Sequence, residues 1–160
     1  MFIIYDMFSK KEFTTFDIAK LFDISRSNVQ QYIDRGLLTP SLERTQGRGT
    51  KSLFSLNDLY RFRLFQKLYA VGLSQREAAE KSFSVDFRKT GEKGNNWLRV
   101  VRDKSKRKII YCNEESIQAE LFGTDIFIAI NILRIKEEID VLVGVYSTDS
   151  GHLFHVNPAA

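Results

Sequence analysis

The chain has 160 residues, 43% of them hydrophobic and 13 of them Phe, which is enough for one or two small domains with a buried core. Its formal charge of +4 is uneven, because residues 1–81 carry 13 Lys and Arg against 9 Asp and Glu, while residues 82–160 carry 11 of each. No membrane-spanning run or signal peptide is evident, and the single cysteine, Cys112, excludes an internal disulfide, so we expect a cytoplasmic protein.

Two short helices joined by a tight turn are predicted between Thr14 and Leu38. Thr14 or Thr15 can cap the first helix and Ser25 can cap the second, because their side-chain oxygens accept from the free amides of a first helical turn. Gly36 supplies the left-handed residue that commonly ends a helix. A helix, a turn and a second helix form the helix-turn-helix layout, with an ordinary helical hairpin as the alternative.

The second predicted helix has one apolar and one polar face. Val29, Tyr32 and Ile33 point one way, and polar side chains suited to base edges or phosphates point the other. The candidate DNA-binding residues of this helix are Ser25, Arg26, Ser27, Asn28, Gln30, Gln31 and Tyr32.

A hairpin resembling a DNA-binding wing is expected next, with strands over Leu42–Thr45 and Lys51–Phe54 and a glycine-containing loop over residues 46–50. Its candidate DNA-binding residues are Arg44, Arg48 and Lys51, and we expect Arg48 and Lys51 to contact phosphates. Ser55 then caps a longer helix over residues 56–71, and Ser74 and Glu77 form the capping box of a further short helix.

Residues 14–81 resemble the DNA-binding domain of the MerR family of bacterial transcription regulators. The resemblance rests on DIAKLFDIS, NVQQYIDRGLLTP and GRGTKSLFSLNDLYRFRLFQKLYAVGLSQREAAE, in register. It implies a homodimer on an inverted repeat of double-stranded DNA, distortion of the promoter between the half-sites, and RNA polymerase as a further candidate partner. Gln30 and Gln31 stand where the family usually has Arg-Tyr, and Ser52-Leu53-Phe54 replaces a frequent wing Arg-Tyr, so we expect fewer phosphate contacts.

The second half of the chain lacks the long helix that usually follows this domain in the family. We predict a domain over residues 1–81, a linker over residues 82–96 and a C-terminal dimerisation or effector domain over residues 97–160. Trp97–Arg102 and Lys108–Cys112 are predicted strands around a basic loop. That hairpin is either a second nucleic-acid surface or a charged tip that keeps a sheet edge soluble. A short helix is expected over residues 113–122, and residues 127–132 form a strand or begin a helix.

An amphipathic helix is predicted from Ile132 to Tyr146, because apolar residues recur at spacings of three and four. We expect this stripe to hold two subunits together, and packing within one chain is the alternative. The candidate dimerisation residues are Ile132, Ile135, Ile139, Leu142, Val143 and Tyr146.

The expected fold class is α+β: an N-terminal winged helix-turn-helix followed by a small α/β region with a hairpin and an amphipathic helix. We expect no catalytic residues, no cofactor and no metal, because no catalytic motif is present and the pair His152 and His155 lacks neighbouring ligands. Cys112 is expected to be a buried apolar residue. The sequence therefore favours a sequence-specific transcription regulator with an unidentified effector; the alternative is a structural or adaptor protein of chromosome organisation or phage biology.

Overall fold

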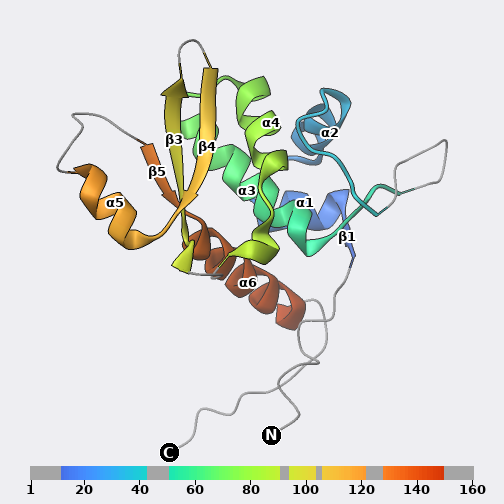
Figure 1. The fold of residues 1–160 in the computed structure, drawn as a ribbon. Coiled ribbons are helices and arrows are strands. Elements are labelled where there is room, and N and C mark those ends of the chain that lie inside the picture. The colour runs from blue at the N-terminus through green and yellow to red at the C-terminus, as the bar shows by residue number, and fades with distance from the viewer. Residues whose placement is uncertain (1–11, 43–50, 91–93, 104–105, 122–127, 150–160) are drawn as a thin grey trace, which may run out of the picture.

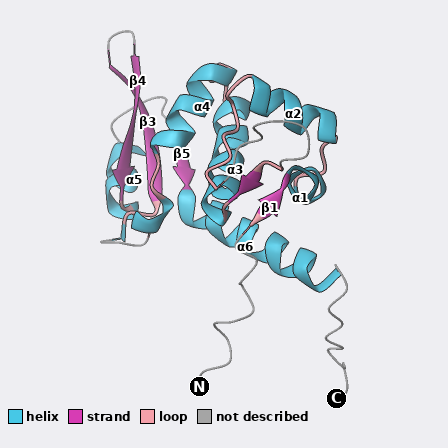
Figure 2. Cartoon of the chain, turned by 90° about the vertical axis from the view of Figure 1, so that its right-hand side faces the viewer, coloured by secondary structure: helices cyan, strands magenta, loops and turns pink. Residues whose placement is uncertain are grey.

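The computed structural model describes residues 12–42, 51–90, 94–103, 106–121 and 128–149. Within these ranges the chain forms six α-helices, a short 3-10 helix and two small antiparallel sheets, which confirms the mixed α+β class. The N-terminal helices lie on one side of the molecule and the larger sheet on the other, and α6 runs along the lower edge in both views (Figure 1, Figure 2).

The two predicted N-terminal helices are present as α1, Thr15–Leu21, and α2, Arg26–Asp34. The Thr14 side chain caps α1 in a capping box with Asp17, and the Ser25 hydroxyl oxygen accepts from the backbone N–H of Asn28 at 3.1 Å. Gly36 ends the second helix with a φ of 68°, a conformation that glycine adopts without steric cost. The helix-turn-helix arrangement expected from the sequence is therefore formed.

The small sheet differs from the expected hairpin. Strand β2 covers only Leu53–Phe54, and it pairs antiparallel with β1, Phe13–Thr14, a partner that the sequence did not predict. The preceding segment approaches β2 through one bond, from the N–H of Leu42 to the carbonyl oxygen of Leu53 at 3.2 Å. Residues 43–50, which contain the expected wing loop, lie outside the described residues.

Helices α3, Leu56–Ala70, and α4, Gln75–Ser84, complete the N-terminal half. Both begin at the predicted serine caps, and α3 has a full capping box between Ser55 and Asp58. The apolar faces of these helices meet in one core, with most members buried and the first two packed at its border. Its members are Leu21, Ile33, Val29, Leu59, Phe62, Phe65 and Leu68.

The segment expected to be a linker is partly structured. Helix α4 continues to Ser84, and a 3-10 helix, η1, covers Phe87–Lys89. Val85 and Phe87 are each 1% exposed, and the Phe87 ring lies 5.3 Å from the ring of Tyr60 on α3. This part of the chain therefore contributes to the core, while the division into domains stays a prediction.

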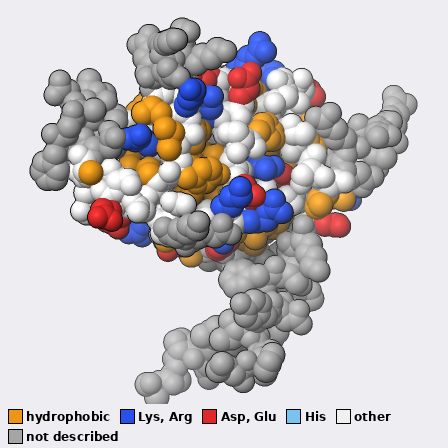
Figure 3. All heavy atoms as spheres, in the orientation of Figure 1, with side chains coloured by type: hydrophobic (Ala, Val, Ile, Leu, Met, Phe, Trp, Pro, Cys, Tyr) orange, Lys and Arg blue, Asp and Glu red, His pale blue; other side chains and the backbone are white. Residues whose placement is uncertain are grey.

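The expected C-terminal hairpin is formed by β3, Trp97–Asp103, and β4, Lys106–Cys112. Helix α5, Glu114–Leu121, connects it to β5, Ile128–Asn131, which pairs with β3 so that the strand order is β4-β3-β5. Leu98 and Val100 of β3 are buried toward the core, whereas Ile110 on the opposite face is 40% exposed. Figure 3 shows hydrophobic side chains gathered over β3 and β4, with Lys and Arg side chains among them.

Helix α6, Ile132–Asp149, requires a correction to the predicted dimer seam. Ile132, Ile135, Ile139 and Val143 are at most 4% exposed within a single chain, because α6 packs against α3, α1 and β3. Leu142 is partly buried beside them, and the side chain of Tyr146 lies outside the described part. The alternative of an intrachain core is therefore the one formed. None of the helices in the described ranges is long and apolar enough to cross a membrane.

Candidate nucleic-acid interface

The outward face of α2 carries the polar side chains that were predicted to bind DNA. Six of the seven candidates on this helix and its cap are exposed, whereas Val29, on the opposite face, is fully buried. The exposed residues are Ser25, Arg26, Ser27, Asn28, Gln30 and Gln31. Hydrogen-bond donors and acceptors thus face outward on α2, while its apolar side packs against the core.

Tyr32 is placed differently from the other candidates. Its ring lies 5.6 Å from the ring of Phe62 and 5.8 Å from that of Phe65, both on α3, and its side chain is partly buried. Edge-to-face and tilted aromatic contacts of this kind fix the packing of neighbouring helices. The Tyr32 ring therefore packs α2 against α3.

Gln30 has a partner on its own helix. Its side-chain amide donates to the carboxylate of Asp34 at 2.8 Å, one helical turn further on. An incoming nucleic acid would therefore meet a Gln30 side chain already engaged and a carboxylate at the same edge of α2. The side-chain amide of Gln31 makes no such bond among the described residues, so it is more available than Gln30 for contact with a base.

The cations expected on the wing are only partly described. Arg44 and Arg48 lie outside the described residues. Lys51 is exposed immediately before β2, and it lines a hollow of about 690 Å³ together with Arg26 of α2. The structure thereby brings a residue from the predicted wing and one from the second helix to a common surface.

Asp58 anchors the chain where it leaves the helix-turn-helix. Its Oδ2 accepts from the backbone N–H of Ser41 at 3.1 Å, from the Ser41 hydroxyl at 2.6 Å and from the N–H of Ser55 at 2.8 Å. Asp58 is 2% exposed, and its Oδ1 is buried without a partner among the described residues. The same carboxylate thus completes the capping box of α3 and holds Ser41 beside the start of that helix.

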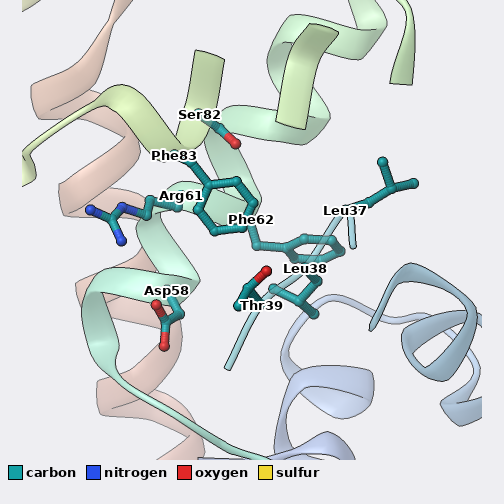
Figure 4. A pocket seen from close by; sticks show the side chains of 8 residues that line it. All are labelled: Leu37, Leu38, Thr39, Asp58, Arg61, Phe62, Ser82 and Phe83. Atoms are coloured by element: carbon teal, nitrogen blue, oxygen red, sulfur yellow. The ribbon is translucent and has the colours of Figure 1, made fainter. Parts of the chain in front are cut away.

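The cavity beside Asp58 is too small for an organic effector. Figure 4 shows the side chains that line it, among them Asp58, Arg61 and Phe62 of α3 and Phe83 of α4. Its volume of about 10 Å³ leaves room for about one water molecule. The site is therefore part of the scaffold that supports the interface.

The remaining sequence-predicted groups lie apart from α2. Arg107 of the basic hairpin donates to Oε2 of Glu77 on α4 at 3.0 Å, so this cation connects the two halves of the chain. Cys112 is 9% exposed with its Sγ 3.7 Å from the carbonyl oxygen of Trp97, as expected for a buried apolar residue. His152 and His155 lie outside the described residues, and no cluster of three potential metal ligands occurs within the described ranges.

Sequence reasoning missed one exposed side chain at this surface. Phe16, in the first turn of α1, is 54% exposed, and the guanidinium carbon of Arg26 lies 5.8 Å from the centre of its ring. The sequence did place an aromatic residue, Phe16, at an outward position of the first helix. Helical periodicity alone does not show that its ring contacts Arg26 on the second helix.

Comparison with known proteins agrees with this arrangement over the N-terminal half of the chain. Residues 13–81 match the family model described as MerR HTH family regulatory protein, which covers a little under half of the sequence. No curated protein matches the chain. The matched range begins at β1 and ends within α4, so it contains α1, α2 and α3 in full. Residues 13–81 therefore match a MerR-family helix-turn-helix segment.

Proposed function

We propose that the chain is a sequence-specific, DNA-binding transcription regulator of the MerR type. The observation that carries this proposal is the exposed polar face of α2 within the segment that matches the family model. Base edges in the major groove are distinguished by hydrogen bonds from Arg, Gln, Asn and Ser side chains, and this face presents all four residue types. A second helix that lies in the major groove is the usual geometry of this motif.

Base reading and phosphate binding are expected to be divided between different elements. Gln31 and Asn28 on the outward face of α2 are the proposed base contacts. Lys51, with Arg44 and Arg48, is the proposed source of phosphate contacts from a wing. Amides at Gln30 and Gln31 add no charge, so the affinity of a single half-site should depend strongly on these few cations.

A homodimer on an inverted repeat is the expected assembly, because one helix-turn-helix covers one half-site. The apolar stripe of α6 is buried within its own chain, which favours another surface for the proposed dimer. Promoter distortion between the half-sites, contact with RNA polymerase in the cytoplasm and the presence of an effector are extensions of this proposal.

Selection of bound sequences from random duplex DNA tests the proposal directly. The wild-type chain should enrich a palindromic consensus. A double variant of the proposed interface, Arg26→Ala with Gln31→Ala, should bind duplex DNA more weakly and lose the base preference at the positions that Gln31 reads. The matched control changes the same residue types elsewhere, Arg88→Ala on η1 with Gln118→Ala on α5, both exposed, and should select the wild-type consensus.

Two other outcomes would contradict the regulator. Binding without sequence enrichment would support the adaptor alternative, in which the same fold engages DNA for organisation. Absence of binding to any duplex by the folded wild-type chain would remove DNA from the list of partners.

A further inference from the structure

A hollow at the edge of the proposed interface lies between the first turns of α1 and α2 and the start of β2. It has a volume of about 690 Å³, and its described lining contains no carboxylate. Two cations, Arg26 and Lys51, and hydroxyl groups from Thr15 and Ser27 contribute to it. Cations and hydroxyl donors around a space of this kind suit an anion with several acceptor oxygens.

The exposure of Phe16, which also lines this hollow, needs an explanation. Its ring is 54% exposed, although it lies at the start of a helix whose residues Ile18 and Ala19 are buried in the core. The guanidinium carbon of Arg26 is 5.8 Å from the ring centre, within the range of an attractive cation–π contact. The contact joins α1 to α2 across the turn of the motif, and it restricts the directions that the Arg26 guanidinium can take.

We propose that this hollow is a binding site for a phosphodiester of the DNA strand beside the groove, and that Phe16 is the positioning residue that holds Arg26 for it. The inference rests on the proposed function and adds a site to it. In helix-turn-helix complexes the first helix crosses the DNA backbone while the second enters the groove, so a hollow between their first turns faces the strand at the groove edge. Arg26 and Lys51 then bind the same strand from two elements.

This site would compensate for the phosphate contacts that the neutral amides of Gln30 and Gln31 do not supply. Arg26 is the only cation within α2, and Gln30 is already bonded to Asp34. A guanidinium presents several N–H donors in one plane and binds phosphate oxygens in a bidentate manner. Restricting that plane before DNA arrives lowers the entropy lost on binding.

Salt dependence of binding identifies the target of Arg26. The logarithm of the association constant for a selected duplex is measured against the logarithm of salt concentration for wild type, Arg26→Gln, Lys51→Gln and the control Arg88→Gln. Each of the first two variants should lower the slope by about 0.9, the value for one lost phosphate contact, on consensus and scrambled duplexes alike. Arg88→Gln should keep the wild-type slope. A loss confined to one base pair would overturn the phosphodiester assignment.

A double-mutant cycle tests the role of Phe16. Phe16→Leu should weaken binding roughly two- to fivefold, the range of an exposed cation–π contact, and Phe16→Tyr should restore it. In the Arg26→Gln background, Phe16→Leu should have no further effect, because a positioning residue acts through its partner. Thermal unfolding of Phe16→Leu should match wild type, since the ring is exposed.

Two results separate failure of this inference from failure of the proposed function. Wild-type DNA binding with an equal loss from Phe16→Leu in both backgrounds would show that Phe16 acts independently of Arg26, and would overturn the inference alone. Absence of wild-type binding to every duplex would overturn the proposed function and the inference together.

Discussion

The guanidinium of Arg63 on α3 forms an ion pair with the carboxylate of Glu138 on α6, 75 residues further along the chain. Lys67, one turn along α3, lies 4.0 Å from the second oxygen of the same carboxylate. The segment that matches the MerR family model is thereby connected to the C-terminal helix by charge as well as by apolar packing. This connection has consequences for stability that can be measured.

Glu138→Gln should lower the free energy of unfolding by up to about 1 kcal/mol. The effect is small because the Arg63 and Glu138 side chains are 27% and 35% exposed and water screens the pair. The neighbouring Glu137→Gln is the control, because Glu137 is 55% exposed and lies 4.0 Å from Arg134 on its own helix. Urea denaturation of both variants checks this, and equal losses would argue against a role for the α3–α6 pair.

Ile139→Asp should destabilise the chain by more than about 3 kcal/mol, because it places a carboxylate at a position that is 1% exposed. Val141 on the same helix is 65% exposed, so Val141→Asp should change the free energy of unfolding by less than about 0.5 kcal/mol. Circular dichroism with urea measures the folding, and sedimentation measures the mass. Conversion of a folded dimer into a folded monomer by Ile139→Asp would restore the dimer seam that the sequence predicted.

Tyr60 makes stability depend on alkaline pH. Its pKa lies well above the ordinary value of 10.0, mainly because burial removes water and also because its hydroxyl donates to Asp140 on α6. Above pH 10 the unfolded chain loses the Tyr60 proton and the folded chain keeps it, so the free energy of unfolding contributed by this group is complete below pH 10 and falls as pH rises. The limiting slope is about 1.4 kcal/mol per pH unit.

Tyr60→Phe isolates this contribution. The variant should be less stable than wild type at pH 7, because it leaves the Asp140 carboxylate without its donor. The difference should shrink between pH 10 and pH 11. Urea denaturation across this range provides the measurement, with Tyr69→Phe, at a half-exposed ring, as the control. A constant difference at all pH values would show that the Tyr60 proton is not retained by the fold.

Asp58→Ala should cost about 2–3 kcal/mol, because it removes the carboxylate half of the α3 capping box and leaves the backbone N–H groups of Ser41 and Ser55 without their acceptor. Asp58→Asn should cost less, since one side-chain oxygen remains. Asn57→Ala at the adjacent, partly exposed position is the control for helix propensity. Thermal denaturation distinguishes these variants, and an Asp58→Ala loss no larger than that of Asn57→Ala would contradict the anchoring role.

Gln31→Ala should change base preference at one or two positions of the bound sequence, by about 1–3 kcal/mol of discrimination. Gln118→Ala, an exposed glutamine on α5, is the matched control and should leave preference unchanged. Competition binding on a panel of single-base operator variants gives the result. Equal weakening on consensus and scrambled duplexes would show that Gln31 does not read a base.

Local signals in the sequence determined where the helices of the N-terminal half begin and end. Ser25, Ser55 and Ser74 each cap the helix expected to follow, because a cap acts on amides only three residues away. The spacing of apolar residues likewise predicted which faces are buried, as Val29 illustrates. The family resemblance was also detectable, because its motifs lie in consecutive elements.

The tertiary structure decided which buried faces meet. The stripe of α6 was evident from the sequence, but its periodicity is the same whether it packs on a second subunit or on α3. The pairing of β2 with Phe13–Thr14, the Arg63–Glu138 ion pair and the Phe16–Arg26 contact likewise join residues from separate elements. Periodicity and capping depend on neighbours within a few residues, whereas the choice of partner depends on how the shapes and charges of whole elements fit together, and that choice is made only in the folded chain.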